Sequence, residues 1–283
     1  MKKLLTAILL LAGLIPGIVA AVEDMTTPVR IGLTPTFPHD QYQPLEAWRL
    51  YMEKKLKRPV EFVRRDRYIE TMDLLRLRKL DFAWVCDYPY VYFKKQVKLL
   101  AVPVHKGRPY YRSFLIVPKS DTKTTSILQL KDKVFAYTDP YSNTGYLTPR
   151  HELQQAGEDP ARFFRKTFFA WSHRRVLEAV ATGLADGGAI SSHVWDTLSI
   201  GKPELTGAVR VVTQSAEYGF APFVAQNAVS DETFQAVQRL LLEMETDEEG
   251  RALLRQLNLD RFIAGDAKLF KRIERVIRAA GEK

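Results

Sequence analysis

The sequence predicts an α/β protein with two lobes that are joined by two crossings of the chain. Short apolar strand patterns alternate with helical stretches, as in proteins with mainly parallel sheets. The pattern gives roughly ten strands, which favours two sheets over one. The segments 113–119 and 216–221 are the expected crossings between the lobes. Two such connections form a hinge, as in proteins that close on a ligand.

The elements follow each other from residue 29 onward. Helices are expected at about 41–56 and 67–79, and the chain from 231 onward is expected to be helical, with caps at Ser230 and Asp266. Lobe 1 then comprises 28–118 and 220–283, and lobe 2 comprises 119–219. The expected strands are 29–35, 59–65, 81–86, 99–105, 110–119, 134–139, 166–171, 187–192, 209–214 and 220–226.

The first 21 residues have the pattern of a secretory signal peptide. Lys2 and Lys3 precede an apolar run that ends at Leu14, and small residues follow at Ala20 and Ala21. The apolar run is shorter than a membrane-spanning helix needs, although an uncleaved anchor is the alternative. The sequence therefore predicts a signal peptide over residues 1–21, cleaved after Ala20 or Ala21, and export to the periplasm.

The composition argues against several classes of protein. The single cysteine, Cys86, allows no intrachain disulfide, and its place at the end of an apolar strand predicts a buried, inert thiol. The formal charge of +9 suits anionic ligands or a membrane surface, but the basic residues form no stripe of the kind that binds nucleic acid. The five histidines lack metal-ligand spacing. We expect no metal, no cofactor and no nucleic-acid partner.

The segment TDPYSNTGYLTPR, 138–150, begins a helix although it contains Gly145 and Pro149. A proline crowds the carbonyl four residues before it, and here that residue is a glycine. Ser142 is placed to cap the helix, and Asn143 and Thr144 lie in its first turn. Unpaired N–H groups and the helix dipole make such a turn suitable for an anion. The alternative interpretation is an ordinary capped helix.

A second helix start lies in AWSHRRVLEAVATG, where Ser172 is the expected cap and His173 opens the first turn. His173 would lie at the carboxyl end of the preceding strand, where open parallel sheets bind ligands. A surface imidazole is the alternative.

These motifs resemble the periplasmic phosphate/phosphite/phosphonate-binding proteins of ABC transporters, often called PhnD-like. The segment DPYSNTGYLTP is similar to the family's Asp-Pro-x-Ser-x-Ser/Thr-Gly-x-x-x-Pro, and LRLRKLDFAW and HRRVLEAVATGLAD also match. The resemblance covers about 29–257. It implies a two-lobed class II binding fold in which Ser142, Asn143, Thr144 and His173 hold the ligand oxygens and Tyr68 lines the cleft.

Three positions depart from the family pattern. Members that bind aminoalkyl phosphonates hold the amine with acidic residues, where this chain has His193 and Ala221, and a cleft tyrosine is replaced by Val85. The resemblance therefore implies that the anion half of the site is kept and the amine half is lost, so 2-aminoethylphosphonate is not the expected ligand. His193 is a further candidate to hold an oxyanion.

We therefore expect a monomeric, exported solute-binding protein that captures a small oxyanion of the phosphonate, phosphate or phosphite type and delivers it to a membrane ABC permease. One alternative is a sensor of the same fold that signals to a membrane kinase or cyclase. Another is an enzyme that uses His173 or His193 as a base, but no nucleophile in the sequence pairs with either residue. We expect no catalytic activity.

Overall fold

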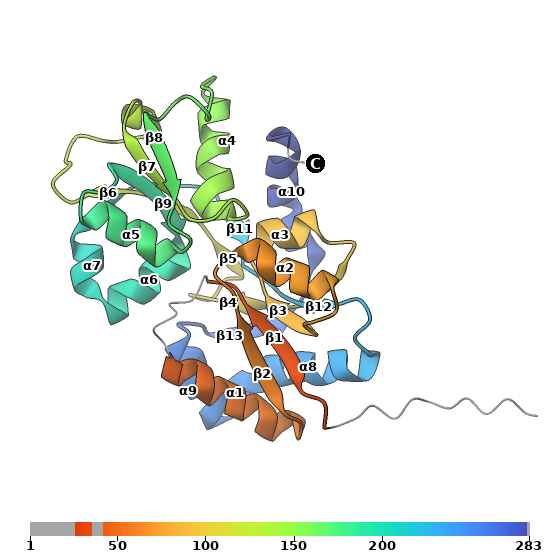
Figure 1. Cartoon of the computed structure of the whole chain (residues 1–283). Coiled ribbons are helices and arrows are strands. Elements are labelled where there is room, and N and C mark those ends of the chain that lie inside the picture. The colour runs from red at the N-terminus through yellow and green to blue at the C-terminus, as the bar shows by residue number, and fades with distance from the viewer. Residues whose placement is uncertain (1–25, 36–41, 282–283) are drawn as a thin grey trace, which may run out of the picture.

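The structure, a computed structural model, describes residues 26–35 and 42–281, and these form two lobes (Figure 1). Each lobe has its own sheet, and a short two-stranded ribbon lies between them. The expected signal peptide, 1–21, lies outside the described residues. Within the described part of the chain, no helix combines the length and the apolar character that a membrane crossing needs.

Lobe 1 contains a six-stranded sheet in the order β13-β4-β12-β3-β1-β2. β1 is parallel to β2 and β3, whereas β12 is antiparallel to β3 and β4. The strands are β1 (Val29–Leu33), β2 (Val60–Arg64), β3 (Phe82–Trp84), β4 (Val97–Val104), β12 (Phe223–Gln226) and β13 (Arg261–Ala264). The helices are α1 (Tyr42–Leu56), α2 (Tyr68–Arg76), α3 (Asp87–Tyr92), α8 (Asp231–Glu243), η3 (Met244–Thr246), α9 (Glu248–Gln256), η4 (Ala267–Phe270) and α10 (Lys271–Ala279).

Lobe 2 contains a five-stranded sheet in the order β10-β6-β9-β7-β8. β7 is parallel to β8 and β9, and β6 is antiparallel to β9 and β10. The strands are β6 (Ser113–Pro118), β7 (Val134–Tyr137), β8 (Lys166–Phe169), β9 (Gly187–Ser191) and β10 (Val209–Gln214). The helices are η1 (Ile127–Leu130), η2 (Asn143–Leu147), α4 (Thr148–Gln155), α5 (His173–Ala181), α6 (Ser192–Gly201) and α7 (Pro203–Gly207).

The chain crosses between the lobes at β5 (Tyr110–Tyr111) and β11 (Tyr218–Gly219), which pair antiparallel. The second crossing lies inside the expected segment 216–221. The first comes earlier than expected, because 113–118 is strand β6 of the lobe 2 sheet rather than a connection. The boundary at 118/119 is therefore wrong. The apolar run 110–119 is two strands, β5 and β6, which are interrupted at Arg112. The Arg112 N–H donates to the Ser192 hydroxyl at 3.0 Å and does not continue the ribbon.

The lobes are packed differently. The core of lobe 1 gathers aromatic rings, with Trp48 meeting Trp84 and Phe223 at centroid distances of 5.8 and 5.9 Å. The sheet of lobe 2 buries apolar side chains in two separate clusters. The last helix, α10, follows the final strand of lobe 1 along the chain, but it also packs against α4 and η2 of lobe 2 (Figure 1). The end of the chain thus contacts both lobes.

The helix that begins in the segment 138–150 opens with a π-helical turn, η2, and this turn accommodates both Gly145 and Pro149. The Leu147 N–H donates to the Ser142 carbonyl, five residues back, at 3.0 Å. Pro149 then occupies the second position of α4, and it has no N–H to offer the Gly145 carbonyl. That carbonyl accepts instead from the N–H of Thr138 at 3.1 Å. Because Pro149 cannot donate to it, the Gly145 carbonyl is available for the Thr138 N–H. This hydrogen bond connects the helix start to the end of β7.

Gly145 is required at this turn because a side chain has no room. A Cβ atom built on Gly145 would lie 2.1 Å from Thr138 Oγ1 and 2.5 Å from Thr138 Cβ. We predict that Gly145→Ala lowers the free energy of unfolding by on the order of 1–3 kcal/mol, as overpacked sites do. Urea denaturation measures the change. Gly201→Ala is the matched control, since nothing lies within 4 Å of its added Cβ. Equal stabilities of the two variants would contradict the prediction.

Candidate functional site

The turn at η2 brings Ser142 and Thr144 into the buried region between the lobes. Ser142 Oγ accepts the Gly145 N–H at 3.0 Å, so it caps the helix as expected. The main-chain carbonyl of Thr144 accepts from the Ser113 hydroxyl at 2.6 Å. The Thr144 hydroxyl is itself fully buried and has no hydrogen-bond partner among the described residues. It can therefore bind a ligand atom without breaking an existing contact.

Asn143 links the two lobes. Its Nδ2 donates to Asp87 Oδ2 at 2.7 Å, and its Oδ1 accepts from the Thr148 hydroxyl at 2.9 Å. Asp87 lies at the start of α3 in lobe 1, where its Oδ1 also accepts the Tyr88 N–H at 2.9 Å and the Tyr111 hydroxyl at 2.6 Å. Burial raises the pKa of Asp87 to about 6. Both ends of the Asn143 amide are thus occupied by protein groups.

His173 opens α5 under the cap of Ser172, as expected. Its Nδ1 accepts the Ser191 N–H at 3.2 Å and lies 3.1 Å from the Thr138 hydroxyl. Because Nδ1 accepts a main-chain N–H, the ring proton is assigned to Nε2, which lies 3.4 Å from the Tyr68 hydroxyl.

The imidazole of His173 is neutral. Burial lowers its pKa to about 3, with a smaller contribution from His193. At neutral pH the ring therefore offers an N–H donor that carries no formal charge, and that donor faces the boundary between the lobes.

Tyr68 supplies the other side of that boundary. It is fully buried at the start of α2 in lobe 1, and its N–H donates to Asp139 Oδ2 of lobe 2 at 3.1 Å. Asp139 Oδ1 accepts the Tyr141 N–H at 2.7 Å. Burial raises the pKa of Asp139. The contacts of Tyr68 and Asn143 hold the lobes together, and they gather Tyr68, Ser142, Asn143, Thr144 and His173 in one region.

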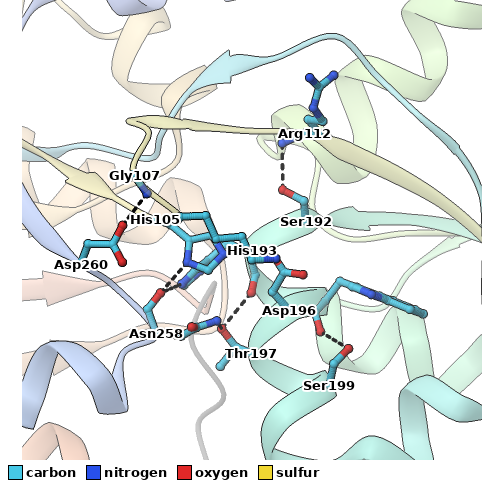
Figure 2. Close-up of polar contacts among 12 residues, drawn as sticks. His105, Gly107, Arg112, Ser192, His193, Asp196, Thr197, Ser199, Asn258 and Asp260 are labelled. Atoms are coloured by element: carbon cyan, nitrogen blue, oxygen red, sulfur yellow. Dashed lines mark hydrogen bonds and ion pairs between the residues drawn. The ribbon is translucent and has the colours of Figure 1, made fainter.

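The His193 side chain contacts a different part of the boundary between the lobes. Its Nε2 lies 3.1 Å from the Leu257 carbonyl and 3.2 Å from the Asn258 carbonyl, both in lobe 1 (Figure 2). Its ring packs edge-on against the rings of His105 and Phe220, each at a centroid distance of 5.0 Å. The Nε2–H therefore serves a junction beside the crossings and is not aimed at the Thr144 hydroxyl.

Three residues of this region were not singled out as site residues from the sequence. Thr138 and Asp139 end the strand pattern of β7, and their position before the helix start was the available signal. Asp87 lies in the first turn of α3, whose N-cap residue is Cys86, and its carboxylate accepts from both the Tyr88 N–H and Asn143 Nδ2. Its contact with Asn143 spans 56 residues, which no local pattern reveals.

Titration of a buried histidine should be visible in stability. Burial, and then His105, lower the pKa of His193 to about 4, against 6.5 in an unfolded chain. Between these values only the unfolded chain binds the proton, so stability present above pH 6.5 is lost as the pH falls toward 4.

We predict that His193→Gln, which keeps an N–H donor but cannot titrate, loses unfolding free energy less steeply over this range, by up to about 1.4 kcal/mol per pH unit. Urea unfolding of both proteins at several pH values measures the slopes. Parallel slopes would contradict this assignment.

The donors of the site are hydroxyl, imidazole and amide groups. Within residues 26–35 and 42–281, no group of three or more His, Cys, Asp or Glu side chains is placed to hold a metal ion. Cys86 is buried, and burial raises the pKa of its thiol. The arrangement can bind by hydrogen bonding.

Comparisons with known proteins agree with this architecture. The probable ABC transporter phosphite binding protein PhnD1 of Prochlorococcus marinus (strain MIT 9301) is 24% identical over 237 residues, 80% of each chain. The phosphonates-binding periplasmic protein of Escherichia coli (strain K12) is 25% identical over 248 residues, 84% of this chain and 72% of the relative.

The solved structure of PhnD1 from Prochlorococcus marinus (MIT 9301) in complex with methylphosphonate has the same fold, with a TM-score of 0.82 at 21% identity over 90% of this chain and 98% of that one. The two-lobed fold is thereby confirmed. A family model described as "ABC transporter, phosphonate, periplasmic substrate-binding protein" matches residues 31–270. The chain therefore belongs to the family of periplasmic substrate-binding proteins of phosphonate ABC transporters.

Proposed function

We propose that this chain captures a small oxyanion of the phosphonate, phosphate or phosphite type between its lobes and delivers it to a membrane permease. The observation that carries the proposal is the buried hydroxyl of Thr144, which has no partner among the described residues. Buried polar groups in native proteins are nearly always hydrogen-bonded, so such a group is explained when a ligand supplies its partner. The phosphite-binding relative and the methylphosphonate complex support the same ligand class.

The groups around Thr144 suit an anion. Thr138 packs on Gly145, the residue after Thr144, and its hydroxyl also reaches His173, so the first turn of η2 and the imidazole are close neighbours. The His173 Nε2–H and the Tyr68 hydroxyl are neutral donors, and hydrogen bonds from neutral donors to an oxyanion are stronger than those between neutral groups. Thr144, His173 and Tyr68 would hold the oxygens, while Ser142 and Asn143 fix the turn and the lobes.

The remaining expectations complete the proposal. Residues 1–21 would direct export and be removed, and the mature chain would act as a monomer without a covalent step. His193 would support the junction between the lobes rather than hold the ligand, because its Nε2 faces two main-chain carbonyls. Nothing in the comparisons favours the sensor alternative.

We predict that Thr144→Ala weakens binding of methylphosphonate and phosphate without lowering stability. Losing one hydrogen bond to a charged ligand reduces affinity by about 1.5–3 kcal/mol, or roughly ten- to hundredfold. The unliganded protein should not lose stability, because the hydroxyl bonds to no described residue. Calorimetry gives the affinity, and thermal unfolding without ligand gives the stability.

Thr144→Ser, which keeps a hydroxyl, is the matched control and should retain most of the affinity. His173→Ala should also weaken binding, through loss of the Nε2 donor. A Thr144→Ala variant that is destabilised yet binds as tightly as the wild type would show that this turn is only a helix start.

The acidic groups near the site are not free to hold an amine. Ala221 and His193 occupy the positions where the family resemblance places acids, and the Ala221 carbonyl accepts the Trp84 indole N–H at 2.9 Å. The buried carboxylate of Asp87 already accepts hydrogen bonds from Asn143 and Tyr111, among others. An ammonium group brought into this region would lose its hydration and would have to compete with these donors for the carboxylate.

We therefore predict that 2-aminoethylphosphonate binds more weakly than methylphosphonate or phosphate, by at least about tenfold, which corresponds to roughly 1.4 kcal/mol. Competition calorimetry measures the order of affinities. Tighter binding of the aminated ligand would overturn the prediction, and loss of that binding in Asp87→Asn would then assign the amine to Asp87.

A further inference from the structure

Trp171 adopts a backbone conformation that is unfavourable for a bulky residue. Its φ angle is +65°, in the left-handed region that glycine and asparagine occupy far more readily. The conformation is fixed by the Trp171 N–H, which donates to the Thr138 carbonyl at 2.7 Å. A glycine would meet this backbone requirement with less strain. Strain of this kind at a functional region indicates that the side chain itself is needed.

The indole of Trp171 is covered by a cation from the other lobe. The guanidinium carbon of Arg67 lies 4.7 Å from the ring centroid, within the range of a cation–π contact. Arg67 is exposed, and it forms no ion pair with an acidic side chain among the described residues. Its charge acts on the nearby carboxylate of Asp139, whose pKa it lowers against the larger effect of burial.

The pair lies directly outside the site. Arg67 precedes Tyr68, and Trp171 stands two residues before His173, so the stacked pair flanks the contact between Tyr68 and His173. Tyr68 and His173 are buried, whereas Arg67 is exposed and Trp171 is half-buried. The stacked side chains are thus the outermost of these contacts between α2 and the start of α5.

We propose that Arg67 and Trp171 are positioning residues that form a clasp when the lobes close, and that this clasp slows the release of the bound anion. The inference rests on the proposed function. The two side chains belong to different lobes, so they separate when the lobes open, and the energy of their stacking is gained only in the closed form. Interactions specific to the bound form act mainly on the dissociation rate. The clasp touches no ligand atom.

The test is a double-mutant cycle with Arg67→Ala and Trp171→Leu, using methylphosphonate and phosphate as probes. Stopped-flow competition gives the dissociation rate, and calorimetry gives the affinity. Each single variant should release the anion roughly three- to thirtyfold faster, the range that a cation–π contact can account for. The double variant should be no faster than the faster single variant, because both remove the same contact.

Three further variants separate a clasp from a general effect. Trp171→Gly relieves the backbone strain, so it should keep its melting temperature without ligand while releasing the anion as fast as Trp171→Leu. Arg65→Ala removes an equal exposed charge two residues away and should leave the dissociation rate unchanged. Trp195→Phe controls for the loss of one fluorescent indole.

Wild-type dissociation rates in both single variants, or additive effects in the double variant, would refute the clasp and leave the proposed function standing. The clasp would also be refuted if the double-mutant cycle gave the same coupling energy between Arg67 and Trp171 in the thermal unfolding of the unliganded protein. The contact would then be present before the ligand binds. If the wild type binds neither probe nor phosphite, the proposed function fails and the clasp fails with it.

Discussion

The contacts of Thr138 position the groups that lobe 2 presents to the region between the lobes. Its N–H donates to the Gly145 carbonyl, its carbonyl accepts the Trp171 N–H, and its hydroxyl lies 3.1 Å from His173 Nδ1. One residue at the end of β7 thus sets the position of the η2 turn and of the start of α5. The close packing on Gly145 leaves no freedom for this arrangement to shift. A change at Thr138 would therefore affect both donors that lobe 2 contributes to the proposed site, Thr144 and His173.

The sequence was sufficient for features that depend on neighbouring residues. The α/β class, the caps at Ser142 and Ser172 and the buried Cys86 follow from short patterns, and the structure confirms them. The predicted lobe boundary at 118/119 is wrong because an apolar run has the same sequence pattern whether its residues pair in the ribbon between the lobes or in the sheet of one lobe. The direction of His193 and the bond between Asp87 and Asn143 depend on segments far apart in the chain. Periodicity cannot supply such contacts, because it records only which face a residue occupies.

The regions where the lobes meet differ in chemistry. Beside the crossings, His105 Nδ1 contacts the Asn258 carbonyl at 2.8 Å and its Nε2 contacts Asp196 at 2.9 Å, while Asn258 Nδ2 donates to the Thr197 hydroxyl (Figure 2). This junction is dense in hydrogen bonds and ties the segment after α9 to α6. In the region of Tyr68 and His173, the Tyr68 N–H donates to Asp139 at 3.1 Å and the Tyr68 hydroxyl lies 3.4 Å from His173 Nε2, while Asn143 Nδ2 donates to Asp87 at 2.7 Å. If the ligand binds beside Tyr68 and His173 as proposed, opening of the lobes there while the junction stays closed would be a hinge motion.

The lone thiol has a consequence for how the chain matures. Cys86 Sγ lies against Asp87 and Tyr111, inside the folded protein, and its raised pKa keeps it protonated. Thiolate is the form that attacks a disulfide, so burial protects the thiol of the native chain from disulfide exchange. An unfolded copy exposes the same sulfur and can be captured as a mixed disulfide. The reactivity of this one sulfur toward a disulfide therefore distinguishes unfolded chains from folded ones.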